Sequence, residues 1–210
     1  MKHFTEYRVI LWDFDGVIMD SMPIRDSGFE QVLKDYPTEQ VARLLRFHRA
    51  QGGLSRFVKF RHFFEDIRGE TVSEKQVQEL AIRFSKIMLE NLINPKYLIE
   101  ESLNFIKENF QNQKFHIVSG SDEKELNKIC SGLNIRSYFK TIKGSPTPKN
   151  KLVADIIKKY EYKNKDVCLI GDSINDLEAA QGNDIAFFGF NNPDLKEKSD
   201  NYIDSFNSLR

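Results

Sequence analysis

Two aspartates stand directly after one of the most hydrophobic short runs of the chain. Residues 8–12, RVILW, read as a buried strand, and Asp13 and Asp15 follow one residue apart, with Gly16 next. Carboxylates this close raise each other's pKa unless a cation neutralises them. Taken alone, the Asp15-Gly16 pair would also suit an ordinary turn. The pair is a candidate for nucleophilic, acid–base or metal chemistry if other segments supply partners.

A second acidic cluster follows another apolar run. In CLIGDSINDLEAA, residues 168–180, Asp172 and Asp176 come after a strand-like stretch. In a parallel sheet the carboxyl ends of the strands share one edge, so three or four carboxylates would converge on one crevice with Asp13. An oxygen-only cluster is what Mg²⁺ prefers. The two clusters together predict a magnesium site.

Two further segments offer groups that suit a phosphate. Ser119, Gly120 and Ser121 end a strand-like run just before a helical pattern, and present hydroxyl and N–H groups. Lys149 or Lys151 supplies a cation at the start of the next helix. Taken singly, Ser119 would suit a helix cap, and either lysine would suit the solvated start of a helix. Together with the carboxylates, these groups predict a phosphoryl-transfer site.

The elements that must position these groups are readable from hydrophobic periodicity. From residue 114 onward, strand-like runs alternate with helical patterns, which predicts an α/β fold, a Rossmann-like parallel sheet with helices on both faces. We expect the tail, residues 191–210, to be only partly ordered because it is polar. The expected strands are residues 8–12, 114–119, 139–144, 166–171 and 184–190.

About ninety residues without a convincing strand separate the first two strands, too many for a simple crossover. Within them, a strong amphipathic helix begins at a capping-box pattern, Ser73 and Gln76. This predicts an inserted all-helical cap. Further helices are expected at 25–35, 38–50 and 54–66, and we assign residues 1–22 and 96–210 to the core and 23–95 to the cap.

The segment from Arg43 to His62 contains six lysines and arginines and no acid. We interpret most of these cations as a solvated helical face. Gly52-Gly53 breaks the helix just before Arg56. If this turn faces the crevice, Arg56 would hold the leaving group of a substrate.

Composition sets the broad class. The chain has 210 residues, 40% of them hydrophobic, and 31 basic residues balance 31 acidic ones, so we expect neither a nucleic-acid nor a membrane partner. Cys130 and Cys168 lack metal-ligand spacing and fit buried thiols in a reducing cytosol. No signal peptide or transmembrane run is apparent, and His116 inside a strand reads as structural. We expect a cytoplasmic monomer or homodimer.

The order and spacing of DFDGVIMDS, VSGS, a downstream lysine and GDSIND resemble the four motifs of the haloacid dehalogenase superfamily. The resemblance spans about residues 8–190 and points to the branch with a helical cap, which includes phosphoglycolate phosphatases and β-phosphoglucomutases. It implies that Asp13 is the nucleophile that forms an aspartyl-phosphate. It implies that Asp15 protonates the leaving group and then activates water.

The same resemblance assigns the remaining groups. Mg²⁺ would be held by Asp13, the backbone carbonyl of Asp15 and Asp172. Asp176 would lie just outside these ligands and help to hold them in place. Lys149 is preferred to Lys151 as the motif lysine because Leu152 and Val153 then fall where the family's helix is buried. The expected phosphoryl and substrate contacts are Ser119, Lys149, Gly16, Gly120, Ser121 and Arg56.

The resemblance favours a Mg²⁺-dependent phosphatase of a small phosphorylated metabolite, with sugar phosphates as one candidate class. The dehalogenases themselves lack the second aspartate, so Asp15 favours phosphate chemistry. Many sugar-phosphate members carry a histidine where this chain has Arg25, which weakens a second interpretation, a phosphomutase of the β-phosphoglucomutase type. A non-enzymatic binding or regulatory protein on the same fold is a third, but all the expected motif carboxylates are present.

Overall fold

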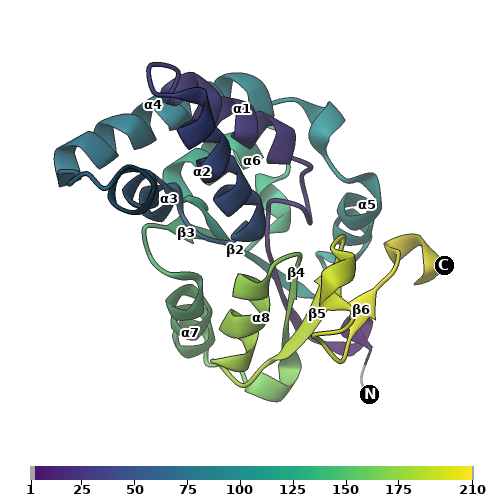
Figure 1. The fold of residues 1–210 in the computed structure, drawn as a ribbon. Coiled ribbons are helices and arrows are strands. Elements are labelled where there is room, and N and C mark those ends of the chain that lie inside the picture. The colour runs from purple at the N-terminus through teal and green to yellow at the C-terminus, as the bar shows by residue number, and fades with distance from the viewer. Residues whose placement is uncertain (1–2, 210) are drawn as a thin grey trace.

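A twisted parallel sheet forms the centre of the molecule in the computed structural model, which describes residues 3–209 (Figure 1). Its strand order is β3-β2-β1-β4-β5-β6, and every neighbouring pair is parallel. This confirms the Rossmann-like α/β fold. The strands are β1 Val9–Trp12, β2 Lys114–Asp122, β3 Thr141–Ser145, β4 Val167–Gly171, β5 Ala186–Phe190 and β6 Tyr202–Ile203.

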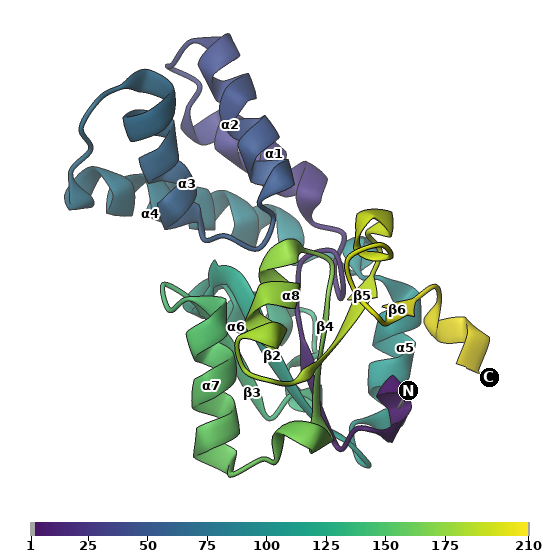
Figure 2. The same cartoon turned by 60° about the horizontal axis from the view of Figure 1, so that its bottom comes forward.

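The central strand β1 is buried on both faces, which explains its unbroken hydrophobic sequence. Side chains alternate along a strand, so Ile10 and Trp12 pack into one apolar cluster and Val9 and Leu11 into another. Helices α5 (Glu100–Asn109) and α6 (Glu123–Gly132) contribute to the first cluster, and α7 (Lys149–Tyr160) and α8 (Ile174–Gln181) to the second. The helices therefore cover both faces of the sheet (Figure 2).

Four helices between β1 and β2 form a separate layer beside the carboxyl ends of the strands (Figure 2). Three aromatic rings from three of these helices pack together, with the Phe29 centroid 4.5 Å from Phe84 and 5.3 Å from Phe60. The predicted capping box of Ser73 and Gln76 begins the last helix. The helical insert is thus confirmed, and its helices are α1 Met22–Val32, α2 Thr38–Ala50, α3 Arg56–His62, which continues as a π-helix over Phe63–Arg68, and α4 Glu74–Leu92.

The chain enters and leaves this helical layer at one place. Met19 and Leu98 form an isolated antiparallel bridge. The Asp20 amide donates to the Tyr97 carbonyl at 2.8 Å, and the Ile99 amide donates to the Ile18 carbonyl at 2.9 Å. Two crossing segments that are far apart in sequence therefore run side by side.

The C-terminal segment is more ordered than its polar composition suggested. β6 pairs with β5, and Phe206 is buried, with its ring centroid 4.9 Å from that of Phe190 and 5.4 Å from that of Phe4. The expectation of a partly ordered tail fails because a few well-spaced apolar residues suffice to anchor it. Short 3₁₀ turns complete the chain at Phe4–Glu6, Pro95–Tyr97, Arg136–Tyr138, Asn164–Asp166, Pro193–Leu195 and Phe206–Leu209.

Several smaller expectations can be compared with the structure. Cys130 and Cys168 are buried and form no disulfide. His116 contacts the Thr141 and Tyr162 hydroxyls at 2.7 and 3.1 Å, which agrees with a structural role. None of the helices in residues 3–209 is long and apolar enough to cross a membrane.

Candidate active site

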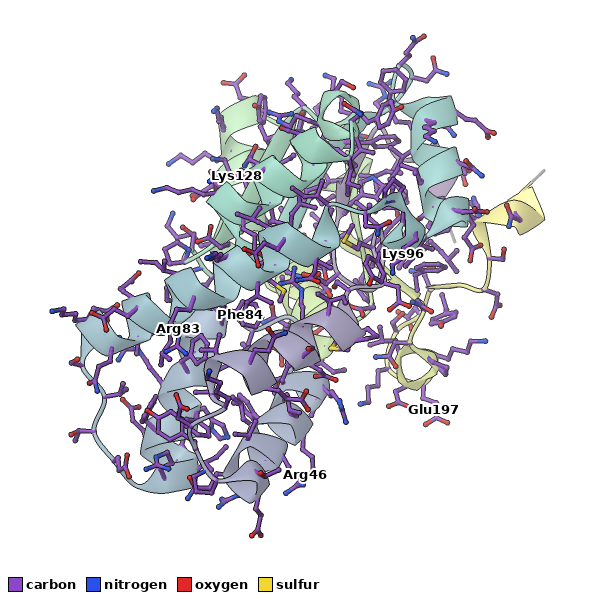
Figure 3. All side chains as sticks on the ribbon, turned by 90° about the horizontal axis from the view of Figure 1, so that it is seen from above. Arg46, Arg83, Phe84, Lys96, Lys128 and Glu197 are labelled. Atoms are coloured by element: carbon purple, nitrogen blue, oxygen red, sulfur yellow. The ribbon has the colours of Figure 1, made fainter. Side chains whose placement is uncertain are left out.

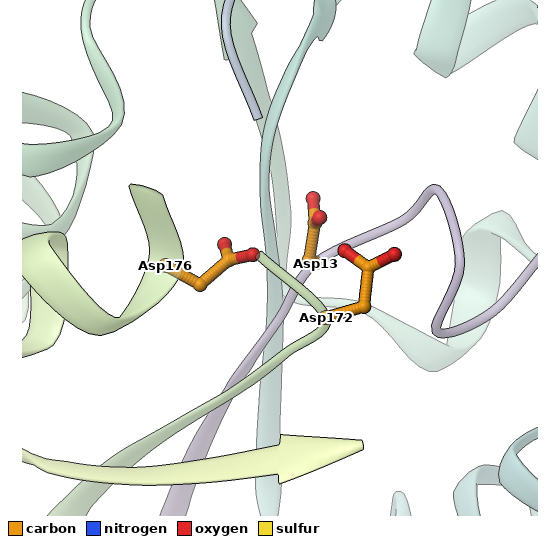
Figure 4. Close-up of side chains that lie close together, drawn as sticks. All are labelled: Asp13, Asp172 and Asp176. Atoms are coloured by element: carbon orange, nitrogen blue, oxygen red, sulfur yellow. The ribbon is translucent and has the colours of Figure 1, made fainter. Parts of the chain in front are cut away.

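Carboxylates from two adjacent strands meet at the carboxyl edge of the sheet. β1 and β4 are paired, with Trp12 opposite Ile170, and the Asp13 amide donates to the Ile170 carbonyl at 2.9 Å. This places Asp13 next to Asp172, in the loop after β4, and to Asp176, in the first turn of α8. One oxygen from each of these three carboxylates lies within 4.8 Å of the other two (Figure 4).

The electrostatics of this cluster fit a divalent cation. Burial, followed by the nearby Asp176, raises the pKa of Asp13 to about 7. Burial and the two neighbouring carboxylates raise the pKa of Asp172 well above its usual value. A cation between the oxygens would favour the ionised forms instead, and oxygen donors of this kind suit Mg²⁺.

Gly16 is required where the loop after β1 passes Asp172. Its φ is +76°, and a Cβ at this position would lie 1.9 Å from an Asp172 carboxylate oxygen. A side chain is excluded by both the backbone conformation and the lack of space. The structure thus gives Gly16 a packing role beside the carboxylates.

Lys149 lies behind Asp13, at the start of α7. Its Nζ is 3.0 Å from Asp13 Oδ1 and also forms an ion pair with Asp176. Burial alone would lower the pKa of Lys149, but the two carboxylates raise it overall. Lys151 is exposed and pairs with Asp155 at 2.8 Å. Of the two candidate lysines, the structure places Lys149 at the carboxylates.

Asp176 is fixed by two different contacts. It accepts hydrogen bonds from the Ser173 amide at 3.1 Å and from the Ser173 hydroxyl at 2.6 Å, so it closes the capping box of α8. Its other oxygen accepts from Lys149. Asp176 therefore orients the lysine while it remains close to Asp13.

The end of β2 forms the wall next to the carboxylates. Ser119 is buried, and its hydroxyl oxygen accepts from the Ser121 amide at 3.1 Å. Gly120 faces the insert so closely that a Cβ would lie 2.2 Å from the Gly53 carbonyl oxygen. The loop between α2 and α3 therefore touches the core at this point.

Asp15 is not part of the three-carboxylate cluster and is held by donors of its own. It accepts hydrogen bonds from Arg25 Nε at 2.7 Å, from the Ser121 hydroxyl at 2.6 Å and from the Ser21 hydroxyl. Burial alone would raise the pKa of Asp15, but Arg25 and the two hydroxyls outweigh it and lower the pKa. The Asp15 side chain is therefore ionised in this arrangement.

One core carboxylate holds two arginines of the insert. Glu125 on α6 pairs with Arg25 through Nη1 at 3.4 Å and with Arg56 through Nη1 at 2.5 Å. Arg56 also donates to the Ser85 hydroxyl at 2.6 Å, and its guanidinium carbon lies 4.7 Å from the centre of the Phe84 ring on α4. These contacts link the helical layer to the core.

The interpretation of the basic segment as a solvated face holds in part. Arg43, Arg46 and Arg49 are exposed, and Figure 3 shows Arg46 at the outer edge of the helices. Arg56 and Lys59 are buried, with exposures of 4% and 3%. Lys59 follows Arg56 by three residues on α3, and this spacing could have indicated that the two cations share a face.

Part of this set lines a cavity of about 30 Å³, whereas Gly16, Lys149, Asp176 and Glu125 lie outside its lining. The sequence had not indicated a site role for His48, Lys59 or Glu125, and it had singled out Arg25 only as a departure from the family pattern. Of the predicted residues, Asp13, Asp15, Ser119, Gly120, Ser121, Arg56 and Asp172 line the cavity, together with Arg25, His48 and Lys59.

A parallel α/β sheet with acidic loops after two adjacent central strands, under a helical insert, defines a class of ligand-binding α/β proteins. Comparison with models of known protein families identifies one family. The model of the haloacid dehalogenase-like hydrolases matches residues 10–190, so the chain belongs to this family. No sequence among the curated proteins matches significantly.

Solved structures with this fold cover nearly the whole chain. A predicted phosphoglycolate phosphatase from Haemophilus somnus 129pt has 19% identity and a TM-score of 0.74, covering 99% of this chain and 98% of its own. A predicted phosphatase from Clostridium acetobutylicum has 16% identity and a TM-score of 0.77, covering 97% and 96%. A β-phosphoglucomutase from Clostridium difficile has 16% identity and a TM-score of 0.77, covering 97% and 93%. At these identities the likeness shows the fold.

Proposed function

We propose that the chain is a Mg²⁺-dependent phosphoric monoester hydrolase that acts on a small phosphorylated metabolite through an aspartyl-phosphate. One observation carries this proposal. The buried Asp13 carboxylate lies 3.0 Å from the Lys149 ammonium, at a cavity that Ser119 and Asp15 also line. A nucleophile, a cation and an acid–base group are thereby close together.

In the first half-reaction, an Asp13 oxygen attacks phosphorus and the bond to the leaving-group oxygen breaks. The leaving oxygen takes a proton from Asp15, which must first be protonated and therefore separated from Arg25. Lys149 and Ser119 would hold the non-bridging phosphoryl oxygens. Gly120 and Ser121 would contribute further polar contacts beside them.

In the second half-reaction, Asp15 suits the role of base, because Arg25 and two hydroxyls donate to its carboxylate and lower its pKa. It accepts a proton from water as the water oxygen attacks phosphorus. The bond between phosphorus and the Asp13 oxygen breaks, which restores the Asp13 carboxylate and gives inorganic phosphate. Asp15 thus regains from water a proton in place of the one that it gave to the leaving group in the first step.

The proposed metal ligands are Asp13, the Asp15 backbone carbonyl and Asp172, with Asp176 supporting from behind. When bound, Mg²⁺ supplies charge stabilisation at the phosphoryl oxygens. The oxygens of Asp13, Asp172 and Asp176 lie close enough to fit it.

We also propose that residues 23–95 act as a cap on a core formed by residues 1–22 and 96–210. The close contact of Gly53 with the loop after β4 supports a closed arrangement, and the cap must open to admit a substrate. Arg56 then contacts the leaving group. Cytoplasmic location and a monomeric or homodimeric state remain predictions from the sequence.

A phosphomutase is the second candidate, supported by the similarity in fold to a β-phosphoglucomutase. The buried Arg25, which donates to Asp15, weakens this candidate, because many sugar-phosphate members of the helical-cap branch carry a histidine at that position. A mutase returns the phosphoryl group to a sugar hydroxyl, so it would yield an isomeric sugar phosphate and little inorganic phosphate.

The test is phosphate release from a set of phosphate monoesters, including p-nitrophenyl phosphate, with and without Mg²⁺. We expect turnover that EDTA abolishes and that added Mg²⁺ restores. Asp13→Asn should remove turnover and leave the protein folded, since it keeps the size of the side chain. Turnover by a verified Asp13→Asn protein, or turnover that survives chelation, would contradict the proposed roles.

A further inference from the structure

The helical insert forms one wall of the cavity, and this wall carries four basic side chains. Arg25 on α1, His48 on α2, and Arg56 and Lys59 on α3 all face the cavity that Asp13 lines. Each is buried, with an exposure of 5% or less. Buried cations normally have a carboxylate partner, so the partners of these groups are informative.

Carboxylates balance the two arginines but leave the lysine without one. Arg25 pairs with Asp15 and Glu125, and Arg56 pairs with Glu125. Among the described residues, Lys59 Nζ has only two polar contacts, the Gly52 carbonyl at 3.1 Å and His48 Nδ1 at 2.8 Å. Within residues 3–209, the buried ammonium group therefore has no carboxylate in direct contact, and Asp15 acts on it only from a distance.

The electrostatics agree with this imbalance. Burial, followed by Arg25, lowers the pKa of Lys59 to about 7, although Asp15 opposes the shift and Arg56 adds to it. Burial and Lys59 lower the pKa of His48 to about 2, so His48 is neutral and adds no charge. An anion beside Lys59 would remove the unfavourable charge imbalance.

Three N–H groups on the same wall also lack an acceptor among the residues that the structure describes. Arg25 Nη2, Arg56 Nε and Arg56 Nη2 are buried without a hydrogen-bond partner. Most buried donors in folded proteins are satisfied. A purely structural link between the insert and the core accounts for the contacts with Glu125, but it accounts for neither these free donors nor Lys59.

We propose that the leaving group of the substrate carries an anionic oxygen, in a carboxylate or a second phosphate, which Lys59 and the free guanidinium donors of Arg56 bind. This inference rests on the proposed phosphatase function, in which Lys149 and Ser119 hold the phosphoryl group being transferred. Lys59 thereby sets specificity, although the sequence placed it on a solvated face. The cavity is about 30 Å³ here, so short leaving groups require the least movement of the insert.

The test uses three two-carbon phosphate monoesters that differ at one end. 2-Hydroxyethyl phosphate has a neutral leaving group, 2-phosphoglycolate a carboxylate and ethylene glycol bisphosphate a second phosphate. We expect kcat/KM to be about tenfold or more higher for at least one anionic ester than for the neutral one, the worth of a charge-assisted hydrogen bond. The preferred anionic ester identifies the source of the charge.

Lys59→Met keeps the length of the side chain and removes its charge. In this variant we expect the ratio of kcat/KM between the preferred anionic ester and the neutral ester to fall about tenfold. Lys34→Met alters an exposed lysine near the end of α1 and should leave that ratio unchanged. A wild-type protein without an anionic preference, or a Lys59→Met protein that keeps it, would overturn the proposal.

Binding without turnover separates this proposal from the proposed function. The Asp13→Asn protein, with and without Lys59→Met, is titrated with each ester in a calorimeter. We expect tighter binding of the anionic ester only when Lys59 is present, even if no ester is hydrolysed. Hydrolysis of p-nitrophenyl phosphate and the neutral ester with equal binding of all three would remove this inference and leave the phosphatase proposal intact.

Discussion

Lys149 is the residue whose role can be separated most cleanly from that of a neighbour. It is buried between Asp13 and Asp176, whereas Lys151, two residues away, is exposed and pairs with Asp155. We expect Lys149→Ala to lower kcat/KM for p-nitrophenyl phosphate by about 100-fold or more, as the loss of a preorganised charge does. Lys151→Ala should be nearly neutral. The reverse ranking in steady-state kinetics would show that the motif lysine is Lys151.

Lys59 should cost the protein stability. Its pKa is about 7 when folded and 10.5 in the reference state, so the unfolded chain binds more protons between these values. Lys59 lowers the free energy of unfolding by its full amount below pH 7, and this effect decreases as the pH rises from 7 towards 10.5. We therefore expect Lys59→Met to raise the Tm by several degrees at pH 6 and by much less at pH 9.

Thermal unfolding of wild type and Lys59→Met at the two pH values, without ligand, measures this difference. Lys34→Met provides the control for a change of net charge. An unchanged Tm at pH 6 would mean that Lys59 has a counter-charge or is solvated. The binding site inferred above would then lose part of its basis.

At this scale the sequence predicted residues that follow strands and missed residues that meet across the fold. Asp13 and Asp172 could be predicted as site residues because each comes directly after an apolar run. Glu125 was not recognisable in the sequence, because its ion pairs with Arg25 and Arg56 join residues that lie 100 and 69 positions apart. Nothing local in the sequence indicates such a pair before the chain is folded.

The loop between α2 and α3 offers a test of closure at the scale of the elements. A Cβ on Gly53 would lie 2.7 Å from Asn175 Cβ and 2.8 Å from the Ser173 hydroxyl, whereas a Cβ on Gly52 would meet nothing within 4 Å. We expect Gly53→Ala to hold the insert away from the core and to lower kcat/KM about tenfold or more. Its Tm should change little.

Gly52→Ala is the matched control and should retain activity, because it adds the same methyl group to open space. Both variants are compared by steady-state kinetics on the best substrate found. Equal activity of the two variants would mean that this contact has no part in catalysis.

Element types were more predictable than element limits. The capping box at Ser73 located the start of α4, and the five predicted strands are all present. The helix expected at 54–66 instead changes from α to π geometry at Phe63, which hydrophobic periodicity does not indicate. β6 was missed because two residues carry no readable periodicity.

The ends of the chain meet in one aromatic cluster, which matters for the stability of the whole molecule. Phe206 is buried, with its ring centroid 5.4 Å from that of Phe4 and 5.7 Å from that of Trp12. We expect Phe206→Ala to lower the free energy of unfolding by about 3–5 kcal/mol, as loss of a buried phenyl ring does. Urea denaturation followed by Trp12 fluorescence measures it. Asn207→Ala, at an exposed neighbour, should cost little, and a comparable loss in both variants would contradict the packing role.

The position of β1 has a consequence for the order in which the protein can assemble during synthesis. β1 is complete at residue 12, but its two neighbours in the sheet begin only at Lys114 and Val167. A nascent chain therefore exposes this apolar strand while all four helices of the insert emerge. Protease accessibility of residues 9–12 in stalled ribosomal chains should persist until β4 has emerged. The helices of the insert, with their local contacts, can form in the meantime, so synthesis favours completion of the insert before the sheet that carries it.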